Sequence, residues 1–317
     1  MRAARYDRYG PPEVLYEGTL PKPVAGPGEV LVRVHAASVN GGELLGRAGK
    51  VRLITGRRFP QGTGIDFAGE VAALGSPMPG LMVGDRVWGL LPRASFGSIA
   101  EFVAVRPRQL ALAPAGLDPA QAVSLLAGGT TSITALRDKA RLRAGERLLV
   151  RGASGGVGSV AVQLGRAYGA HVTALAGARN LGFVRDLGAH EVFDYATTGP
   201  ADLGPFDVVL DTAIGTELGA FRRLLAPGGR MVSITFDSRH MLSSLSYILA
   251  STVFGTRRVR FFSGNPTHRL LADLTRLAEN GALRPVVDTI HPLADIAEAH
   301  RALEAGGVRG KHVIRIG

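Results

Sequence analysis

Residues 146–158 read Glu146-Arg147-Leu148-Leu149-Val150-Arg151-Gly152-Ala153-Ser154-Gly155-Gly156-Val157-Gly158. A short apolar run leads into glycines spaced three residues apart, and an alanine-rich helical pattern follows over 159–168. This order predicts a strand, a tight turn and a helix. Because glycine has no side chain, such a turn lets a pyrophosphate approach the backbone, while the N–H groups and dipole at the helix start attract its charge. We therefore expect residues 153–158 to bind a dinucleotide. The alternative is a glycine turn that only packs a helix on a strand.

The next predicted strand, residues 170–176, indicates which cofactor is bound. A domain that selects NAD usually carries Asp or Glu at the end of this strand, where the carboxylate binds the ribose 2′-hydroxyl. This chain has Gly177-Ala178-Arg179-Asn180 there instead. No carboxylate at these positions repels a 2′-phosphate, and the Arg179 guanidinium can bind one in a fork, so NADPH is favoured over NADH. The alternative for Arg179 is a solvated surface arginine.

Composition narrows the class of protein. The chain has 317 residues, enough for two domains, and a net charge of +11 that comes almost entirely from arginine. The basic residues form no long run and do not alternate with aromatic ones, so we expect no nucleic-acid partner. Cysteine is absent, which excludes disulfides, thiolate metal ligands and cysteine nucleophiles. The sequence starts without a signal-peptide pattern and has no apolar stretch long enough for a bilayer. We therefore expect a cytoplasmic protein without membrane association.

Two kinds of pattern divide the chain. Up to about residue 114, short alternating segments separated by glycine and proline predict a mostly antiparallel, barrel-like β domain. The following pattern predicts two helices, at 118–126 and 131–140, and then strands alternating with helices, which is typical of a parallel sheet covered on both faces. These strands are expected at 146–152, 170–176, 191–194, 206–211 and 230–236, with helices at 156–168, 180–187 and 216–225. The tail, with helices at 267–280 and 293–304, an extended piece at 285–291 and a strand at 312–316, is expected to complete the first domain.

Short motifs follow one another in order over nearly the whole chain: Tyr9–Leu15, Gly28–Val34, Ala36–Asn40, Asp66–Gly69, Val83–Val87, Gly152–Gly158, Leu187–Ala189 and Gly310–Lys311. Through these motifs the chain resembles the zinc-independent quinone oxidoreductase branch of the medium-chain dehydrogenase/reductase superfamily. The resemblance implies an α/β fold in two domains. Residues 123–265 would form a Rossmann-type, parallel-sheet domain that binds the dinucleotide. Residues 1–122 and 266–317 would form a mostly antiparallel, β-barrel-like (GroES-like) catalytic domain.

The residues do not suit a catalytic metal. Zinc enzymes of this superfamily hold their metal through a Cys, a His-Glu pair and a further ligand, and the resemblance places the first of these positions at Asn40, Ile65 and Asp66. Ile65 cannot ligate zinc and Asn40 is a poor substitute for a thiolate, so we expect no metal. No histidine lies at a metal-binding spacing from another. His300 shares a helix face with Ile296 and Leu303, so we expect it to be packed in the interior.

The resemblance also implies which residues contact cofactor and substrate. Asn40 is expected near the nicotinamide ribose and the substrate, as a catalytic residue. The cofactor is expected to contact Thr131 and Lys311. Its pyrophosphate is expected at Ser154, Gly155, Gly156, Val157 and Gly158, and its 2′-phosphate at Gly177, Ala178, Arg179 and Tyr195. Its nicotinamide is expected at Ala213, Phe236, Phe261, Phe262 and Ser263. Alternatives stay open. Asn40 can instead be a turn residue with an unusual backbone angle, and Tyr195 and the Phe261-Phe262 pair can be ordinary core.

One departure from the family bears on substrate binding. Many relatives carry a tyrosine in the helix after Asn40, where this chain has Leu45. A substrate contact through that tyrosine is therefore lost. Arg47 is predicted to replace it as a hydrogen-bond donor and so to be the second catalytic residue. The alternative is that Arg47 is a surface charge.

The expected activity is hydride transfer from NADPH, without a metal, to an acceptor that is already electrophilic, such as a quinone or an activated enone. The family usually forms homodimers through edge strands, and the alternating run 258–262 is the candidate edge. One alternative is an enoyl or 2-alkenal reductase of a biosynthetic pathway. An alternative of another class is a cofactor- or RNA-binding protein with little catalysis.

Overall fold

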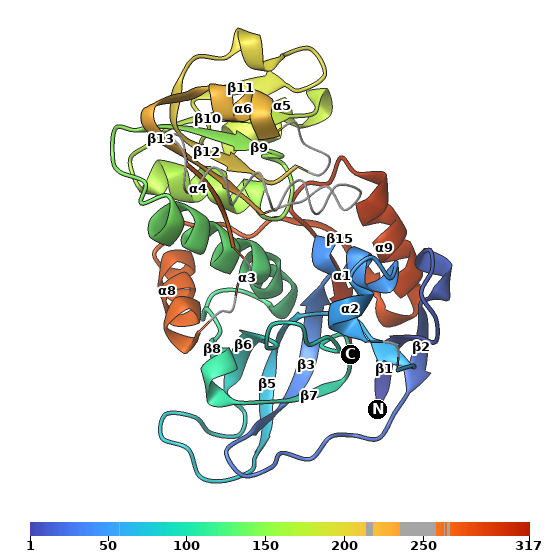
Figure 1. Cartoon of the computed structure of the whole chain (residues 1–317). Coiled ribbons are helices and arrows are strands. Elements are labelled where there is room, and N and C mark those ends of the chain that lie inside the picture. The colour runs from blue at the N-terminus through green and yellow to red at the C-terminus, as the bar shows by residue number, and fades with distance from the viewer. Residues whose placement is uncertain (57, 214–217, 235–257, 263, 265–266) are drawn as a thin grey trace. The chain divides into compact units, whose positions relative to one another are not determined.

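The computed structural model describes residues 1–56, 58–213, 218–234, 258–262, 264 and 267–317 (Figure 1). The chain divides into two compact units, one formed by Met1–Thr130 with Asn265–Gly317 and the other by Thr131–Gly264. The first boundary between the units, at 130/131, lies within the helix α3, Pro119–Ile133. The sequence analysis places this boundary at 122/123. Each unit has its own sheet and its own hydrophobic core, so each is described by itself.

The first unit is built mainly on antiparallel strands. Its larger sheet has the order β15-β16-β3-β5-β6-β8, with β7 paired to β3, and its described strand pairs are antiparallel except β15 with β16. A smaller sheet has the order β2-β1-β4. The predicted antiparallel β fold is confirmed. The bounds of these strands are β1 Arg2–Tyr6, β2 Tyr16–Thr19, β3 Val30–Ser38, β4 Gln61–Gly62, β5 Asp66–Leu74, β6 Arg86–Leu90, β7 Phe102–Val105, β8 Leu110–Leu112, β15 Val287–Pro292 and β16 Lys311–Arg315.

Helices cover the strands of this unit and supply part of its core. α8 (His268–Glu279) begins at Thr267, whose side chain accepts a hydrogen bond from the backbone N–H of Leu270 at 3.4 Å. It packs on β8, and its Thr275 Oγ1 accepts a hydrogen bond from the Trp88 indole at 3.1 Å. The unit also contains α1 Gly41–Arg47, α2 Arg52–Thr55 and α9 Ile296–Ala305, with short 3₁₀ helices at Pro12–Val14, Pro107–Gln109 and Leu293–Asp295.

The structure corrects the prediction of two separate helices at 118–126 and 131–140. A single helix, α3, runs through Gly128-Gly129-Thr130 to Ile133 and continues as a π-helical segment, η3, over Thr134–Lys139. A Cβ atom at Gly129 would lie 2.5 Å from Cδ1 of Leu274. The glycine therefore allows α8 to pack closely on α3. This buried packing outweighs the low helix propensity of glycine, which the sequence pattern treated as a break.

The second unit contains a six-stranded parallel sheet with the order β11-β10-β9-β12-β13-β14. Its strands are β9 Arg147–Arg151, β10 His171–Ala176, β11 Glu191–Asp194, β12 Phe206–Asp211, β13 Leu225–Ser233 and β14 Arg258–Phe261. The predicted parallel sheet is confirmed, although β13 begins at Leu225 and not at 230. Besides η3, the described helices of this unit are α4 Gly158–Ala167, α5 Leu181–Asp186 and α6 Leu218–Arg223, with 3₁₀ helices η4 Ala178–Asn180 and η5 Pro200–Asp202.

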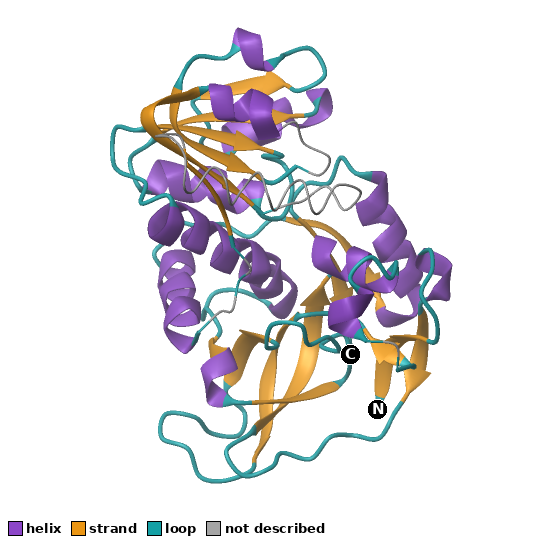
Figure 2. Ribbon diagram, in the orientation of Figure 1, coloured by secondary structure: helices purple, strands orange, loops and turns teal. Residues whose placement is uncertain are grey.

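Burial of consecutive residues shows that both faces of this sheet are covered. Leu148, Leu149 and Val150 in the central strand β9 are each 0% exposed, although successive side chains of a strand point to opposite faces. Figure 2 shows the strands of this sheet flanked by helices. The strand order reverses between β9 and β12, and ligands of open α/β sheets bind outside the carboxyl ends of strands at such a switch point.

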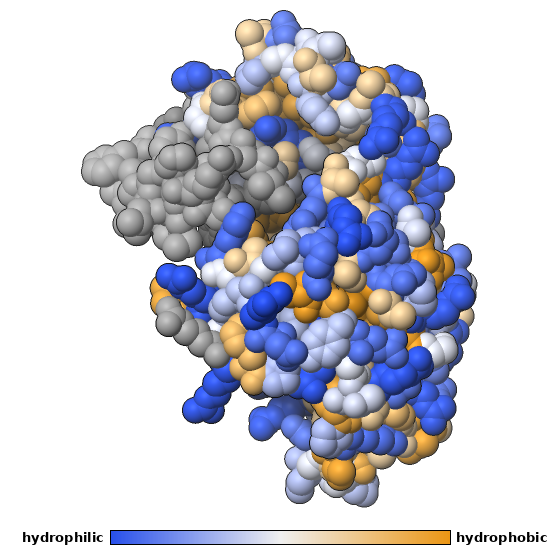
Figure 3. Space-filling view, turned by 90° about the vertical axis from the view of Figure 1, so that its right-hand side faces the viewer, coloured by the Kyte–Doolittle hydropathy of each residue, from blue (hydrophilic) through white to orange (hydrophobic). Residues whose placement is uncertain are grey.

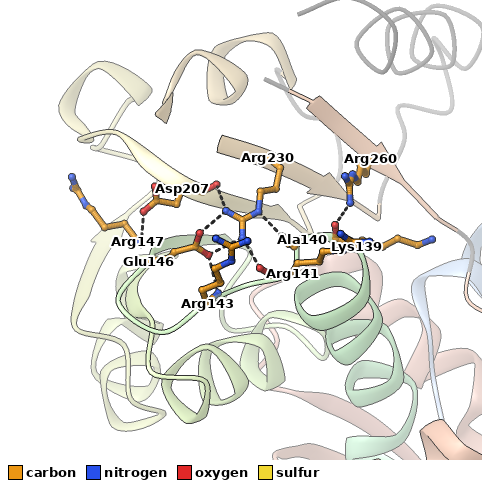
Figure 4. A network of polar contacts seen from close by, with 9 residues as sticks. All are labelled: Lys139, Ala140, Arg141, Arg143, Glu146, Arg147, Asp207, Arg230 and Arg260. Carbon is orange, nitrogen blue, oxygen red and sulfur yellow. Dashed lines mark hydrogen bonds and ion pairs between the residues drawn. The ribbon is translucent and has the colours of Figure 1, made fainter. Parts of the chain in front are cut away.

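A polar network at the amino ends of these strands ties the sheet to the helical segment that precedes it (Figure 4). The Arg230 guanidinium donates to both carboxylate oxygens of Glu146, at 2.8 and 2.7 Å, and to the carbonyl oxygens of Ala140 and Arg141. Arg260 donates to the carbonyl of Lys139. Burial by itself would raise the pKa of Glu146, but hydrogen bonds from Arg230 and from the Arg143 backbone lower it. These arginines satisfy carbonyl groups where η3 ends.

Candidate active site

The glycine turn of the second unit lies at the switch point, between β9 and α4. Gly152 has a φ of +70°, and a Cβ there would lie 2.6 Å from Oγ1 of Thr212. A Cβ at Gly158 would lie 2.1 Å from the carbonyl oxygen of Gly152. These two glycines are required by the turn itself and by the close packing of helix on strand. Gly155 differs, because its nearest described neighbour, the Gly152 oxygen, is 3.6 Å from a built Cβ.

The backbone of this turn is held at several points but keeps free N–H groups. Ser132, on α3, donates its hydroxyl to the carbonyl of Val157 at 3.0 Å, and the Ala153 N–H donates to Leu175 O at 3.0 Å. Within the described residues, the N–H groups of Ser154, Gly156 and Val157 donate to no acceptor. Free N–H groups at the start of a helix are a suitable site for the charge of a pyrophosphate. Thr131, beside Ser132 on α3, is half-buried.

The next strand ends beside residues predicted to hold a 2′-phosphate. The Tyr195 N–H donates to the Ala176 carbonyl at 3.1 Å, and a Cβ at Gly177 would lie 3.4 Å from the Tyr195 ring. The structure therefore places Tyr195 against Gly177, with 67% of Tyr195 exposed. The alternative that Tyr195 belongs to the core is wrong. Ala178 and Arg179 follow in η4, and both are exposed.

The carboxyl end of β12 carries an ion pair that the sequence analysis missed. Arg151 Nη1 lies 2.9 Å from Oδ1 of Asp211, which is 0% exposed, and the guanidinium lies 3.8 Å from the centre of the Phe221 ring. The same Asp211 oxygen accepts a hydrogen bond from the N–H of Ala213 at 3.3 Å. This pair fixes the backbone at Ala213, which is predicted to line the nicotinamide. An arginine at the end of an otherwise apolar strand was the available signal.

The other predicted nicotinamide residues are less completely described. Phe262 is half-buried after the end of β14. Phe236, Ser263 and the side chain of Phe261 lie outside the described part of the structure. β14 is the last described strand at one edge of the sheet, in agreement with the predicted edge.

In the first unit, Asn40 lies between β3 and α1 at the centre of a polar cluster. Its backbone is extended, with φ −122° and ψ 147°, so the alternative of a turn residue with an unusual backbone angle is wrong. Its Nδ2 donates to Ser38 O at 3.0 Å, to Glu43 Oε1 at 2.9 Å and to Asp66 Oδ2 at 3.2 Å. Its Oδ1 accepts a hydrogen bond from Nζ of Lys311, which also donates to the Val39 carbonyl at 2.8 Å.

The charges of this cluster are taken out of water. Glu43 is 1% exposed, Asp66 0% and Lys311 6%. Burial, together with the charge of Asp66, raises the pKa of Glu43 to about 8. Burial also raises the pKa of Asp66, against the opposing effects of Lys311 and of hydrogen bonds from Ser38, and it lowers the pKa of Lys311. At neutral pH Glu43 therefore keeps its proton.

Glu43 and the orientation of Lys311 were missed by the sequence analysis, which assigned Lys311 to the cofactor only. The available signal was an acidic residue, Glu43, three positions after the motif that ends at Asn40, and another, Asp66, at the start of the motif Asp66–Gly69. In the described part of the chain, no group of three or more His, Asp or Glu side chains is arranged to hold a metal ion. The absence of a catalytic metal stays a prediction.

Arg47 is buried, and its polar contacts lie within the first unit. It is 2% exposed, so the alternative of a surface charge is wrong. Its guanidinium donates to the Gly10 carbonyl at 3.1 Å and pairs with Glu304. Burial, together with the nearby Arg47 charge, lowers the pKa of His300 to about 3, and His300 is 0% exposed. The predicted interior packing of His300 is confirmed.

Figure 3 shows one face of the molecule, coloured by the hydropathy of each residue. Hydrophilic residues are spread over its described part, with apolar residues between them. Within the described chain, no helix is both long enough and apolar enough to cross a bilayer.

Two features together define the class of protein: a parallel sheet with a glycine turn at its switch point, and a mostly antiparallel β unit formed from both ends of the chain. They are typical of a dinucleotide-dependent oxidoreductase. Comparison with known proteins agrees with this class. A family model described as an alcohol dehydrogenase GroES-like domain matches residues 26–115, and one described as a zinc-binding dehydrogenase matches residues 187–314.

Comparison with individual proteins identifies the branch of the family. The chain is 31% identical over 325 residues to a chloroplast envelope quinone oxidoreductase homolog of Arabidopsis thaliana, covering 99% of this chain and 98% of that protein. It is 34% identical over 304 residues to a mycocerosic acid synthase-like polyketide synthase of Mycobacterium tuberculosis, covering 92% of this chain and 14% of that protein. The structure of a quinone oxidoreductase from Coxiella burnetii is similar with a TM-score of 0.90 at 30% identity, covering 100% of this chain and 99% of that one.

The chain therefore belongs to the medium-chain dehydrogenase/reductase superfamily, in its quinone oxidoreductase branch. It is an oxidoreductase, and its family uses a nicotinamide cofactor. This membership argues against the alternative of a binding protein with little catalysis.

Proposed function

We propose that the protein is an NADPH-dependent reductase that transfers a hydride to a quinone or an activated enone without a metal ion. The observation that carries this proposal is the second unit's turn, where free N–H groups at the start of α4 lie at the switch point of the sheet. The end of β10 adds support, because it presents Arg179 and Tyr195 and no carboxylate.

The residues that are present fit the cofactor. Ser154 to Gly158 would hold the pyrophosphate, and Gly177, Ala178, Arg179 and Tyr195 the 2′-phosphate. Thr131, Ala213 and Phe262 would lie along the rest of the cofactor. When bound, NADPH supplies the hydride, and a proton from solvent or from the protein completes the reduction. The chain itself orients the cofactor, excludes water and positions Asn40.

Arg47 has a different role from the predicted one in this proposal. Its donors are directed to Gly10 and Glu304, so we assign it to holding α1, which follows Asn40, against α9. This arrangement supports the backbone at Asn40 without contact to substrate.

Arg179→Ala tests the proposed site. We expect the dissociation constant for NADPH to rise by about tenfold to a hundredfold, since a charge-assisted contact to phosphate contributes about 1.5–3 kcal/mol, while that for NADH changes little. Fluorescence titration with both cofactors measures this. Arg185→Ala, an exposed arginine on α5, is the control and should change neither constant. Equal losses for NADPH and NADH in Arg179→Ala would remove Arg179 from the 2′-phosphate site.

Turnover then separates the two candidate substrate classes. NADPH oxidation should be measured with a panel of quinones and of 2-alkenals and enoyl thioesters, and it should survive a chelator. The likeness to a segment of a polyketide synthase favours, as a second candidate, the enoyl or 2-alkenal reductase of a biosynthetic pathway. A preference of kcat/KM for enoyl thioesters over quinones would select it.

We also propose a homodimer that pairs β14 with its copy, since β14 is at an edge of the described sheet. Sedimentation of the purified protein measures the assembly. A monomer at micromolar concentration would contradict the proposal.

A further inference from the structure

The amide of Asn40 has almost no hydrogen-bonding capacity left for a ligand. A side-chain amide has two N–H donors and two lone pairs on its oxygen. Three acceptors surround Nδ2, namely Ser38 O, Glu43 Oε1 and Asp66 Oδ2, at 2.9 to 3.2 Å. Both N–H donors are therefore used inside the protein. On Oδ1 one lone pair accepts from Lys311, and one lone pair remains.

The charges around Asn40 allow only one orientation of the amide. The carboxyl groups of Glu43 and Asp66 face its nitrogen, and the Lys311 ammonium faces its oxygen. A flip of the amide would turn its oxygen toward the Ser38 carbonyl and the Asp66 carboxyl group, and its N–H groups toward the Lys311 ammonium. Each of these contacts would be unfavourable, and more so in a site shielded from water.

Lys311 is itself held in place from several sides. Its ammonium donates to the Val39 carbonyl at 2.8 Å and to Asn40, and its side chain is almost fully buried on β16. Ser38 in turn donates its N–H and hydroxyl to Asp66, at 2.8 and 2.6 Å. The ends of β3, β5 and β16 thus meet in one network around the Asn40 side chain.

We propose that Lys311 is a positioning residue which, with Glu43 and Asp66, fixes the Asn40 oxygen as the only open hydrogen-bonding atom of this side chain. Asn40 then accepts a hydrogen bond from a hydroxyl group and does not donate one to an oxyanion. The proposed quinone and enone acceptors carry carbonyl oxygens and no required hydroxyl, so they cannot supply this donor, whereas the nicotinamide ribose that the family resemblance implies near Asn40 would supply it. This inference rests on the proposed function for the identity of the ligand, but the network itself belongs to the ligand-free protein.

The first test needs no cofactor. The sequence contains four asparagines, Asn40, Asn180, Asn265 and Asn280, so protein labelled with [15N]asparagine gives four pairs of side-chain amide signals. The Asn40 signal is the one lost in Asn40→Ser. In the unmodified protein we expect its amide protons to exchange slowly with solvent, and in Lys311→Met to exchange at least about tenfold faster, because the anchor of Oδ1 is gone.

Lys22→Met is the matched control, since Lys22 is an exposed lysine of the same unit, placed over the Phe102 ring. It should leave the Asn40 signal unchanged. An unchanged Asn40 signal in Lys311→Met would overturn the proposal. If Lys311→Met does not fold because Asp66 loses its compensating charge, Lys311→Met with Asp66→Asn keeps the cluster neutral. Slow exchange of Asn40 in that double variant would equally overturn it.

The second test uses turnover and distinguishes positioning from general stability. In Lys311→Met we expect kcat for NADPH oxidation to fall by about tenfold to a hundredfold, as for a misplaced orienting group, while the acceptor KM changes by less than about threefold. A loss of thermal stability with kcat unchanged would assign Lys311 a structural role only. If the unmodified protein neither binds nor oxidises NADPH, the proposed function fails. The exchange experiment still decides whether Lys311 orients Asn40.

Discussion

The two candidate regions of this protein differ in the groups that form them: one is made of backbone and the other of side chains. The turn between β9 and α4 offers a ligand backbone N–H groups, and glycines provide the room for it. The cluster at Asn40 consists of side chains, and three of them, Glu43, Asp66 and Lys311, are ionisable groups removed from water. The first region depends on glycines, which lack a Cβ atom, and its backbone N–H groups are available to a ligand. The second region depends on the balance of buried charges, and its polar groups bind one another. The same change of pH or of volume should therefore affect them differently.

Gly158→Ala and Gly155→Ala give the largest expected contrast within the turn. A Cβ at Gly158 would lie 2.1 Å from a backbone oxygen, so we expect the second unit to lose about 3 kcal/mol of stability or more, together with NADPH binding. At Gly155 the nearest described atom is 3.6 Å away, and the fold should change by less than about 1 kcal/mol.

NADPH titration and hydrogen exchange of β9 amides measure both effects. The informative case is Gly155→Ala, since a folded protein with about tenfold weaker NADPH binding would show that the pyrophosphate approaches the backbone there. A folded Gly155→Ala with unchanged affinity would move the pyrophosphate away from Gly155. A stable Gly158→Ala would contradict the packing of α4 on the turn.

Glu43→Gln tests the second region through pH. The pKa of Glu43 is raised from 4.5 to about 8 in the folded protein, so between these values the unfolded chain has lost a proton that the folded protein keeps. The contribution of Glu43 to the free energy of unfolding of the first unit should therefore be greatest below pH 4.5 and should fall as pH rises to about 8. The expected slope is up to about 1.4 kcal/mol per pH unit. Glu43→Gln cannot ionise and should remove this slope.

Trp88 makes the measurement specific to the first unit, because it is the single tryptophan of the chain and is 0% exposed. Its fluorescence during urea unfolding at pH 5.5, 6.5 and 7.5 gives the slope. Glu298→Gln, an exposed glutamate of α9, is the control and should keep the slope of the unmodified protein. Equal slopes in Glu43→Gln and in the unmodified protein would mean that Glu43 is ionised in the fold.

The same contrast explains what could be predicted from sequence. The glycine turn, the parallel strands and the antiparallel β unit follow from local periodicity and from glycine spacing, and they are confirmed. The cluster at Asn40 joins residues of β3, α1, β5 and β16, and Lys311 is 271 positions away from Asn40. No local pattern encodes such a contact. For the same reason the break predicted near Gly129 was wrong, since the packing partner Leu274 is distant in sequence.

Arg151 and Arg230 show a second limit of prediction from sequence. Both are arginines on strands of the second unit, and the sequence analysis uses these two only through the net charge and the lack of a long basic run. In the structure, Arg151 pairs with the buried Asp211, and Arg230 satisfies Glu146 and carbonyl groups where η3 ends. The identity of the residue alone does not show whether a guanidinium is solvated or structural. A position level with the ends of neighbouring strands is the better guide, as for Arg230 beside Val208 and Arg258, because carbonyl and carboxylate acceptors gather there.

Arg230→Met is expected to have the smallest effect on NADPH binding, and it separates stability from ligand binding. The side chain of Arg230 is 16% exposed and binds Glu146 with two hydrogen bonds, so its loss should cost the second unit about 2–3 kcal/mol. It lies at the amino ends of the strands, whereas the turn lies at their carboxyl ends, so the NADPH dissociation constant should stay within about twofold under conditions where the unit is folded. Hydrogen exchange of β9 and β12 amides, compared with Arg185→Met, measures the stability. A marked loss of NADPH affinity in folded Arg230→Met would mean that the two ends of the sheet are coupled, and that the turn is not set by its own glycines alone.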